Sequence, residues 1–163
     1  MSIVRITEAY KGGKMNKALL AFLSLVFGLI SAGFAAAACT ATQGEILDAN
    51  YKPQAPKRAS VGSGYVLTGT VRASGDCQPI DGATVELWLA GPDGYSDNYT
   101  GTVVADKSGH YRFQSPFPSA STGRPPHIHM RIAADGFLPI QTEWMPRQGT
   151  ATGLFDIVLE PGG

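Results

Sequence analysis

After residue 62 the chain consists of short apolar segments separated by turn-forming residues. Residues 65–72 and 83–90 alternate apolar and polar side chains, with Leu67 and Val71 on one face of the first segment. Further segments of strand length occupy residues 101–104, 111–113, 127–132, 138–144 and 154–159. Alternation of apolar and polar side chains with a period of two, rich in β-branched and aromatic residues, is typical of half-buried strands. After residue 38 no segment repeats its apolar residues with the period of a helix. We therefore expect an all-β fold, an antiparallel β-sandwich.

The first 38 residues have a different composition. Two lysines precede an apolar run over residues 18–30, and the small residues 35–38 follow. This order is typical of a secretory signal peptide cleaved near Ala38, with Met15 as an alternative start of translation. The apolar run is short for a membrane span, so we expect no stable membrane insertion after cleavage. The sequence thus predicts an exported protein, periplasmic or secreted, with a retained N-terminal anchor or a lipidated Cys39 as alternatives.

The remaining chain divides into an arm and one domain. Residues 39–62 are polar and interrupted by prolines, which predicts an irregular N-terminal arm before a β-sandwich over residues 63–163. Thirteen basic and 13 acidic residues give no net charge, which argues against a nucleic-acid partner. Two cysteines are too few for a four-thiolate zinc site. In an oxidising compartment Cys39 and Cys77 are expected to form one disulfide that ties the arm to the domain.

The segment most informative about chemistry contains two closely spaced histidines. His127 and His129 are two residues apart, and in a strand this spacing places both imidazoles on one face, about 7 Å apart along the chain. Two such imidazoles can bind one transition metal ion. Arg124 lies just before this segment, followed by two rigid prolines. The alternative is that the histidines are ordinary polar residues of an exposed strand face.

The sequence Arg-Pro-Pro-His-Ile-His at residues 124–129 resembles the signature of the intradiol ring-cleavage dioxygenases, which include catechol and protocatechuate dioxygenases. Residues 79–88, 94–96 and 109–113 resemble other landmarks of that family in the same order, so the resemblance extends over about residues 64–160. It implies a β-sandwich with non-haem Fe(III) held by two tyrosinates and two histidines. It also implies an activity that opens catechol rings with dioxygen between the two hydroxyl-bearing carbons.

The resemblance also implies roles for individual residues. It makes Tyr95, His127 and His129 the expected metal ligands. It makes Arg124 the arginine that stabilises an anionic substrate, so Arg124 and Tyr95 are both expected to take part in catalysis. A tyrosine has a pKa of about 10 in water, but a bound cation can hold it deprotonated. Tyr99 is near enough in sequence to be an alternative to Tyr95.

Two positions depart from the family pattern. Ser121 stands where the family usually has its second tyrosine ligand, and serine is a poor anionic ligand. Glu143 stands where the family tends to have glutamine, on the same strand face as Gln141. A carboxylate is therefore expected near the metal, where it can take part in acid–base catalysis. Imidazole and phenolate suit Cu(II) as well as Fe(III), so a divergent relative with copper or another reaction is an alternative.

A third alternative is a non-enzymatic exported module that binds carbohydrate, cell-wall polymer or protein. Its binding face would consist of the aromatic residues Tyr51, Tyr65, Trp88 and Trp144. The remaining histidine, His110, lies beside a turn and is expected to face solvent. The favoured hypothesis is the metalloenzyme, which would act on a catechol-like aromatic and dioxygen.

Overall fold

The computed structural model describes residues 38–45, 50–121 and 123–163, so residues 1–37 of the predicted signal peptide lie outside it. The strands are β1 (Tyr65–Ala73), β2 (Thr84–Gly91), β3 (Gly94–Val104), β4 (His110–Ser115), β5 (Ile128–Ala133), β6 (Ile140–Trp144), β7 (Thr152–Leu154) and β8 (Ile157–Leu159). The predicted all-β fold is confirmed for this part of the chain, which contains no helix. It accordingly contains no helix long and apolar enough to cross a membrane.

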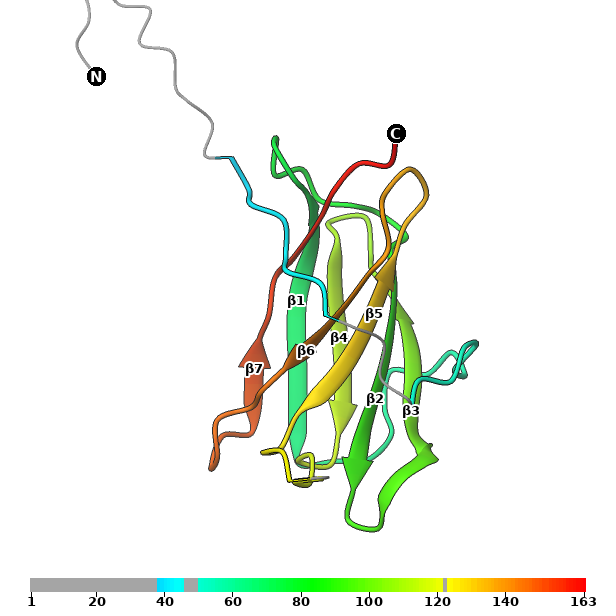
Figure 1. Ribbon diagram of the computed structural model, residues 1–163, viewed down its shortest axis with the longest axis vertical. Helices are drawn as coiled ribbons and strands as arrows, with labels where there is room; N and C mark the ends of the chain where they lie inside the picture. Colours follow the sequence, from blue (N-terminus) through cyan, green and yellow to red (C-terminus); the bar gives the residue numbers. More distant parts are fainter. Residues whose placement is uncertain (1–37, 46–49, 122) are drawn as a thin grey trace, which may run out of the picture. The chain divides into compact units, whose positions relative to one another are not determined.

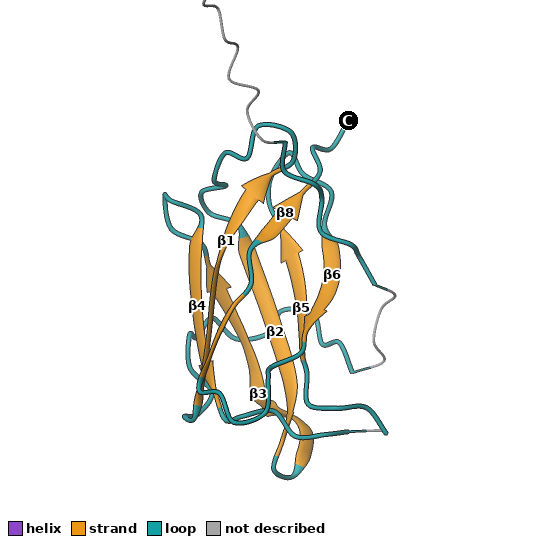
Figure 2. Ribbon diagram, turned by 90° about the vertical axis from the view of Figure 1, so that its left-hand side faces the viewer, coloured by secondary structure: helices purple, strands orange, loops and turns teal. Residues whose placement is uncertain are grey.

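The strands form two sheets packed face to face (Figures 1 and 2). One sheet has the order β3-β2-β5-β6, with antiparallel pairing throughout. In the other sheet β1 pairs antiparallel with β4 on one edge. On its other edge β1 pairs in parallel with β7 and then with β8. The sandwich is therefore antiparallel except where these two short C-terminal strands run alongside β1.

The core lies between the two sheets. Its members are the inward-facing residues of the alternating strands, including Leu67, Val71, Val85, Leu87, Leu89, Ile128, Met130 and Ile132, all with no exposed surface. Strand β2 differs from the simple alternation because its outward-facing Glu86 and Trp88 are buried as well. The cover is supplied by Tyr51 of the arm, whose ring centroid lies 5.1 Å from that of Trp88. The arm thus covers this part of the outer sheet face.

The arm is fixed to the sandwich at several points. The predicted disulfide between Cys39 and Cys77 is present, with the two Cα atoms 5.2 Å apart. The Thr42 amide donates to the Val158 carbonyl at 3.0 Å, and the Glu45 amide donates to the Gln141 carbonyl at 2.7 Å. Residues 57 and 60 form bridges to β3 and β4. In its described residues, the predicted irregular arm over residues 39–62 is therefore held against the sandwich by these contacts.

Strand β3 is longer than the predicted segment 101–104. It begins at Gly94, directly after a two-residue turn, and it contains a bulge between the pairs Trp88–Thr100 and Ala90–Tyr95. The bulge places more residues on β3 than on β2, so the two tyrosines of β3 point in different directions. Tyr99 packs over Gly91, where an added Cβ would lie 2.0 Å from the tyrosine ring. Tyr95 is thereby left to face the other side of the sheet.

Candidate metal centre

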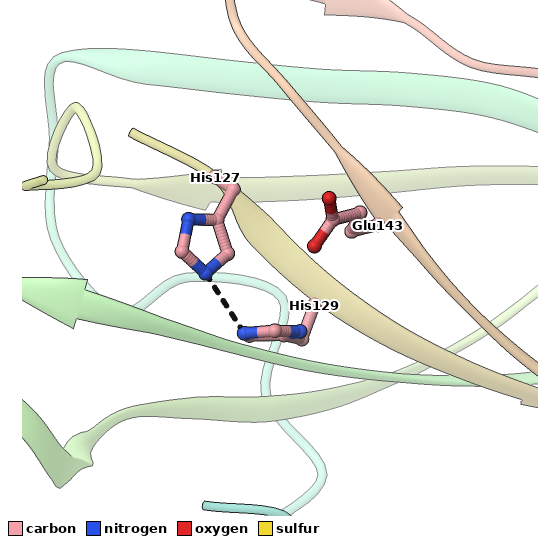
Figure 3. Close-up of side chains that lie close together, drawn as sticks. All are labelled: His127, His129 and Glu143. Atoms are coloured by element: carbon pink, nitrogen blue, oxygen red, sulfur yellow. Dashed lines mark hydrogen bonds between the residues drawn. The ribbon is translucent and has the colours of Figure 1, made fainter. Parts of the chain in front are cut away.

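Three side chains converge at the end of the outer face of the sheet β3-β2-β5-β6. The Tyr95 hydroxyl oxygen lies 3.0 Å from Nε2 of His127 and 3.0 Å from Nε2 of His129. The two Nε2 atoms are 2.9 Å apart. Figure 3 shows the two imidazoles turned toward each other, just before and within β5. The structure therefore brings the three predicted ligands together, whereas Tyr99 lies elsewhere.

The orientation of His127 follows from its local sequence. Its Nδ1 lies 2.7 Å from the carbonyl oxygen of Pro125, and a carbonyl can only accept a hydrogen bond. The proton of a neutral imidazole therefore resides on Nδ1, which leaves a lone pair on Nε2. Two consecutive prolines restrict the backbone before the ring. His127 is 2% exposed, so its lone pair is directed into a dry site.

His129 is held by packing against β2. Trp88 is its cross-strand neighbour, and the two rings are stacked with centroids 5.3 Å apart and an interplanar angle of 11°. Tyr51 contacts the same indole and donates a hydrogen bond of 2.9 Å to Glu86. Burial and the neighbouring Glu86 carboxylate raise the pKa of Tyr51. The arm thus contributes to the surroundings of the second histidine.

A carboxylate lies beside the two histidines. Glu143 on β6 is the cross-strand neighbour of His129, and potential ligand atoms of His127, His129 and Glu143 all lie within 4.8 Å of one another (Figure 3). Nη2 of Arg124 donates to both carboxylate oxygens, at 2.5 and 2.6 Å. The Glu143 side chain is 7% exposed and that of Arg124 is 42% exposed. The hydrogen bonds to this carboxylate raise the pKa of Arg124, so the guanidinium is a permanent charge at the rim of the site.

Ser121 lies at the start of the turn that presents Arg124. The amide of Arg124 donates to the Ser121 carbonyl at 2.8 Å, and the Ser121 amide donates back at 3.2 Å. Within the described residues, the backbone of Ser121 thus closes the turn that leads into the histidine segment. Among the tyrosines of the described residues, Tyr95 is the one whose hydroxyl contacts the two histidines.

The donor geometry fits a metal ion. Three donors at right angles around an ion, each about 2.1 Å away, are separated by about 3.0 Å, whereas tetrahedral donors are separated by about 3.4 Å. The observed separations are 3.0, 3.0 and 2.9 Å. Two imidazoles and a phenolate are ligands for ferric or cupric ions. A cation would be a common partner for the three donor atoms. The residues therefore fit a centre with positions left open for other ligands.

A cavity of about 140 Å³ lies next to this centre. It is lined by Asn50, Lys52, Trp88, Tyr95, Ser96 and Thr100. The sequence did not reveal Asn50 and Lys52 as lining residues, because periodicity does not predict where an irregular arm lies.

The proposed aromatic binding face is not found. Tyr65 and Trp88 are 1% and 4% exposed and belong to different sheets. Tyr65 also accepts a hydrogen bond of 2.7 Å from the indole of Trp144. These side chains pack inside the structure, so they do not form one exposed surface. His110 is exposed, as predicted.

Chlorocatechol 1,2-dioxygenases are among the sequence relatives of this chain. No family model matches the chain. It is 32% identical to a chlorocatechol 1,2-dioxygenase of Pseudomonas sp. (strain P51), over 48% of this chain and 42% of that protein. It is 30% identical to a chlorocatechol 1,2-dioxygenase of Pseudomonas putida, over 48% and 40%. The chain spans about two fifths of the length of the curated relatives it matches.

Solved structures share the fold. The crystal structure of chlorocatechol 1,2-dioxygenase from Pseudomonas putida matches with a TM-score of 0.61 and 22% identity, over 72% of this chain and 71% of that one. The dioxygenase domain of a dioxygenase carbohydrate-binding protein fusion from Streptomyces sp. SirexAA-E matches with a TM-score of 0.66 and 21% identity. That match covers 76% of this chain and all of the other.

Proposed function

Since this chain belongs to the intradiol ring-cleavage dioxygenase family, we propose that it binds non-haem Fe(III) and cleaves catechol-type aromatics with dioxygen. The observation that carries the proposal is the triangle formed by Tyr95, His127 and His129, with sides of 3.0, 3.0 and 2.9 Å. In this reaction the bond between the two hydroxyl-bearing carbons breaks, and both atoms of dioxygen enter the ring-opened product.

The protein's own residues prepare the site. Fe(III), when bound, supplies a Lewis acid that accepts a catechol as its dianion and makes the ring electron-rich toward dioxygen. Tyr95 loses its phenolic proton to serve as the anionic ligand. His127 is held by Pro125 in the tautomer that offers Nε2, and Trp88 fixes the ring plane of His129. The buried setting of both imidazoles limits the access of water.

Arg124 and Glu143 act as a pair in this proposal. The carboxylate holds the guanidinium at the rim of the centre through two hydrogen bonds. From there the positive charge of Arg124 stabilises the anionic substrate. Glu143 partly neutralises that charge, which lowers its repulsion of a metal ion. An acid–base role for Glu143 stays a prediction.

The test uses the colour of the iron-loaded protein and its product. We expect a visible phenolate-to-Fe(III) absorption band and a ring-opened product from a catechol under oxygen. Tyr95→Phe should abolish the band, and His127→Ala should abolish iron binding. His110→Ala is the matched control, because His110 is exposed and outside the centre, and it should retain both properties. A colourless iron-loaded protein that opens no catechol would refute the proposal.

A copper-dependent oxidation of the same substrates is the second candidate. It is favoured by the proximity of Glu143 and by the contact of one tyrosine, not two, with the histidines among the residues that the structure describes. Metal analysis of protein purified from its native host distinguishes the two. Copper in place of iron, with oxidation of catechols but no ring opening, would select this candidate.

We also propose that the protein acts outside the cytosol. The support is the disulfide between Cys39 and Cys77, a bond that persists mainly in oxidising compartments. Fractionation of the native host, followed by N-terminal sequencing, tests this location. Recovery in the cytosol with an uncleaved N-terminus would contradict it.

A further inference from the structure

The cavity beside the metal centre has a wall built from the N-terminal arm. Asn50 and Lys52 belong to the arm, whereas the other lining residues belong to β2 and β3. The cavity reaches the centre through two of these, Tyr95 and Trp88, which are a donor and the ring stacked on His129. A substrate bound to the metal would therefore have the arm on one side.

The size of the cavity suits one aromatic ring. Its volume is about 140 Å³. A cavity of about 150 Å³ in another protein is large enough to bind benzene. The Trp88 indole already contacts the rings of His129 and Tyr51, so an aromatic ring in the cavity would lie beside the part of Trp88 that lines it, with its hydroxyl-bearing edge toward Tyr95. Substituents on the opposite edge would then lie toward the arm.

The arm is held firmly where it lines the cavity. Tyr51, between the two lining residues, contacts Trp88 and donates to Glu86, which also accepts a hydrogen bond of 3.1 Å from Arg131. Further along the arm, Nε of Arg58 donates to the carbonyl oxygen of Thr100 at 2.7 Å. These contacts fix the backbone on both sides of Lys52. They keep the arm beside the cavity, which Lys52 lines.

Lys52 is the charged residue of the lining. Its ammonium forms an ion pair with Asp97 on β3, and the two side chains are 61% and 75% exposed. Ion pairs this exposed are weak, because water screens both charges. An anionic group inside the cavity can therefore compete with Asp97 for the ammonium. No carboxylate lies among the lining residues to repel such a group.

We propose that Lys52 is a specificity-determining residue that favours catechols with an anionic substituent, such as a carboxylate, over unsubstituted catechol. The inference rests on the proposed function, because it assumes that a catechol binds at the metal. Beyond the proposed function, it names catechols with an anionic substituent as the favoured substrates and Lys52 of the arm as the residue that recognises them.

The experiment measures binding to the Fe(III)-loaded protein without oxygen. Catechol and 3,4-dihydroxybenzoate are titrated separately, and each Kd is taken from the change in the visible absorption band. In Lys52→Met we expect the Kd of 3,4-dihydroxybenzoate to rise at least threefold, about 0.7 kcal/mol. The Kd of catechol should change by less than 1.5-fold. The ratio of the two constants cancels effects common to both ligands.

Two further variants sharpen the test. Lys57→Met is the matched control, because Lys57 is an exposed lysine of the same arm that does not line the cavity. In this variant the ratio of the Kd of 3,4-dihydroxybenzoate to the Kd of catechol should equal that of the wild type. Asp97→Asn removes the competing carboxylate and should lower the Kd of 3,4-dihydroxybenzoate.

The outcomes separate the two proposals. If catechol binds and the ratio is the same in all four proteins, the role of Lys52 is refuted while the proposed function stands. If neither ligand binds to the wild-type protein, the proposed function fails and this inference fails with it.

Discussion

The disulfide allows a quantitative prediction about stability. Replacing both Cys39 and Cys77 by serine removes a bond that closes a loop with a sequence separation of 38 residues. The chain-entropy relation gives about 3.9 kcal/mol for a loop of this length at 25 °C. We expect other contacts of the arm to remain in the variant, such as the hydrogen bond from the Thr42 amide to the Val158 carbonyl. We therefore expect the free energy of unfolding to fall by about 2–4 kcal/mol.

Urea unfolding of metal-free protein, followed by tryptophan fluorescence, measures this loss. The slope of the unfolding free energy against urea should increase in the double variant, because the unfolded chain without the crosslink exposes more surface. Metal affinity should change little, since Tyr51 and Arg58 hold the arm independently near the site. A loss below about 1 kcal/mol, with an unchanged slope, would refute the reasoning that the bond acts on the unfolded chain.

Three other substitutions test the packing of the second sheet and its turns. Gly69→Ala should destabilise the protein by about 1–3 kcal/mol in thermal unfolding, because the new Cβ would lie 1.8 Å from the Phe155 carbonyl oxygen; wild-type stability would contradict this contact. Tyr111→Phe should cost about 1 kcal/mol in urea unfolding, since the hydroxyl donates to the same carbonyl at 2.7 Å, and a neutral result would mean that water replaces it. Hydrogen bonds from Ser108 and from the backbone amide of residue 110 hold the pKa of Asp106 below its usual value. This stabilisation is present above the unfolded-state pKa and is lost as the pH falls through the folded-state pKa. Asp106→Asn should therefore flatten the acid side of a stability–pH curve, and an unchanged curve would argue against these bonds.

The strand pattern and the histidine pair could be predicted because both depend on short-range order in the sequence. Alternation placed Leu67 and Val71 in the core, and the two-residue spacing placed His127 and His129 on one face. The disulfide followed from the presence of only two cysteines in a chain expected to be exported.

The first half of β3 could not be predicted from the same signal. Residues 96–100 are mostly polar and lack alternating apolar side chains. Most of them lie in the bulge on the edge of the sheet, between the two stretches of β3 that pair with β2, and Arg58 of the arm donates to the carbonyl oxygens of Asp97 and Thr100. The bulge that separates Tyr95 from Tyr99 depends on this pairing. The choice between the two tyrosines was therefore open until the register was known.

Two ion pairs near the site, Arg124–Glu143 and Lys52–Asp97, differ in how readily a substrate can break them. Glu143 is almost fully buried, so removing Arg124 from it would leave a carboxylate unpaired in a dry environment, which is strongly unfavourable. Lys52 and Asp97 are both largely exposed, so each can be solvated when the other leaves. We therefore expect an anionic substituent of the substrate to draw the Lys52 ammonium away from Asp97. Arg124 stays paired with Glu143 and acts on the substrate through its electrostatic field. We therefore expect selectivity among substrates to depend on the arm, and the effect of the rim charge to be common to all of them.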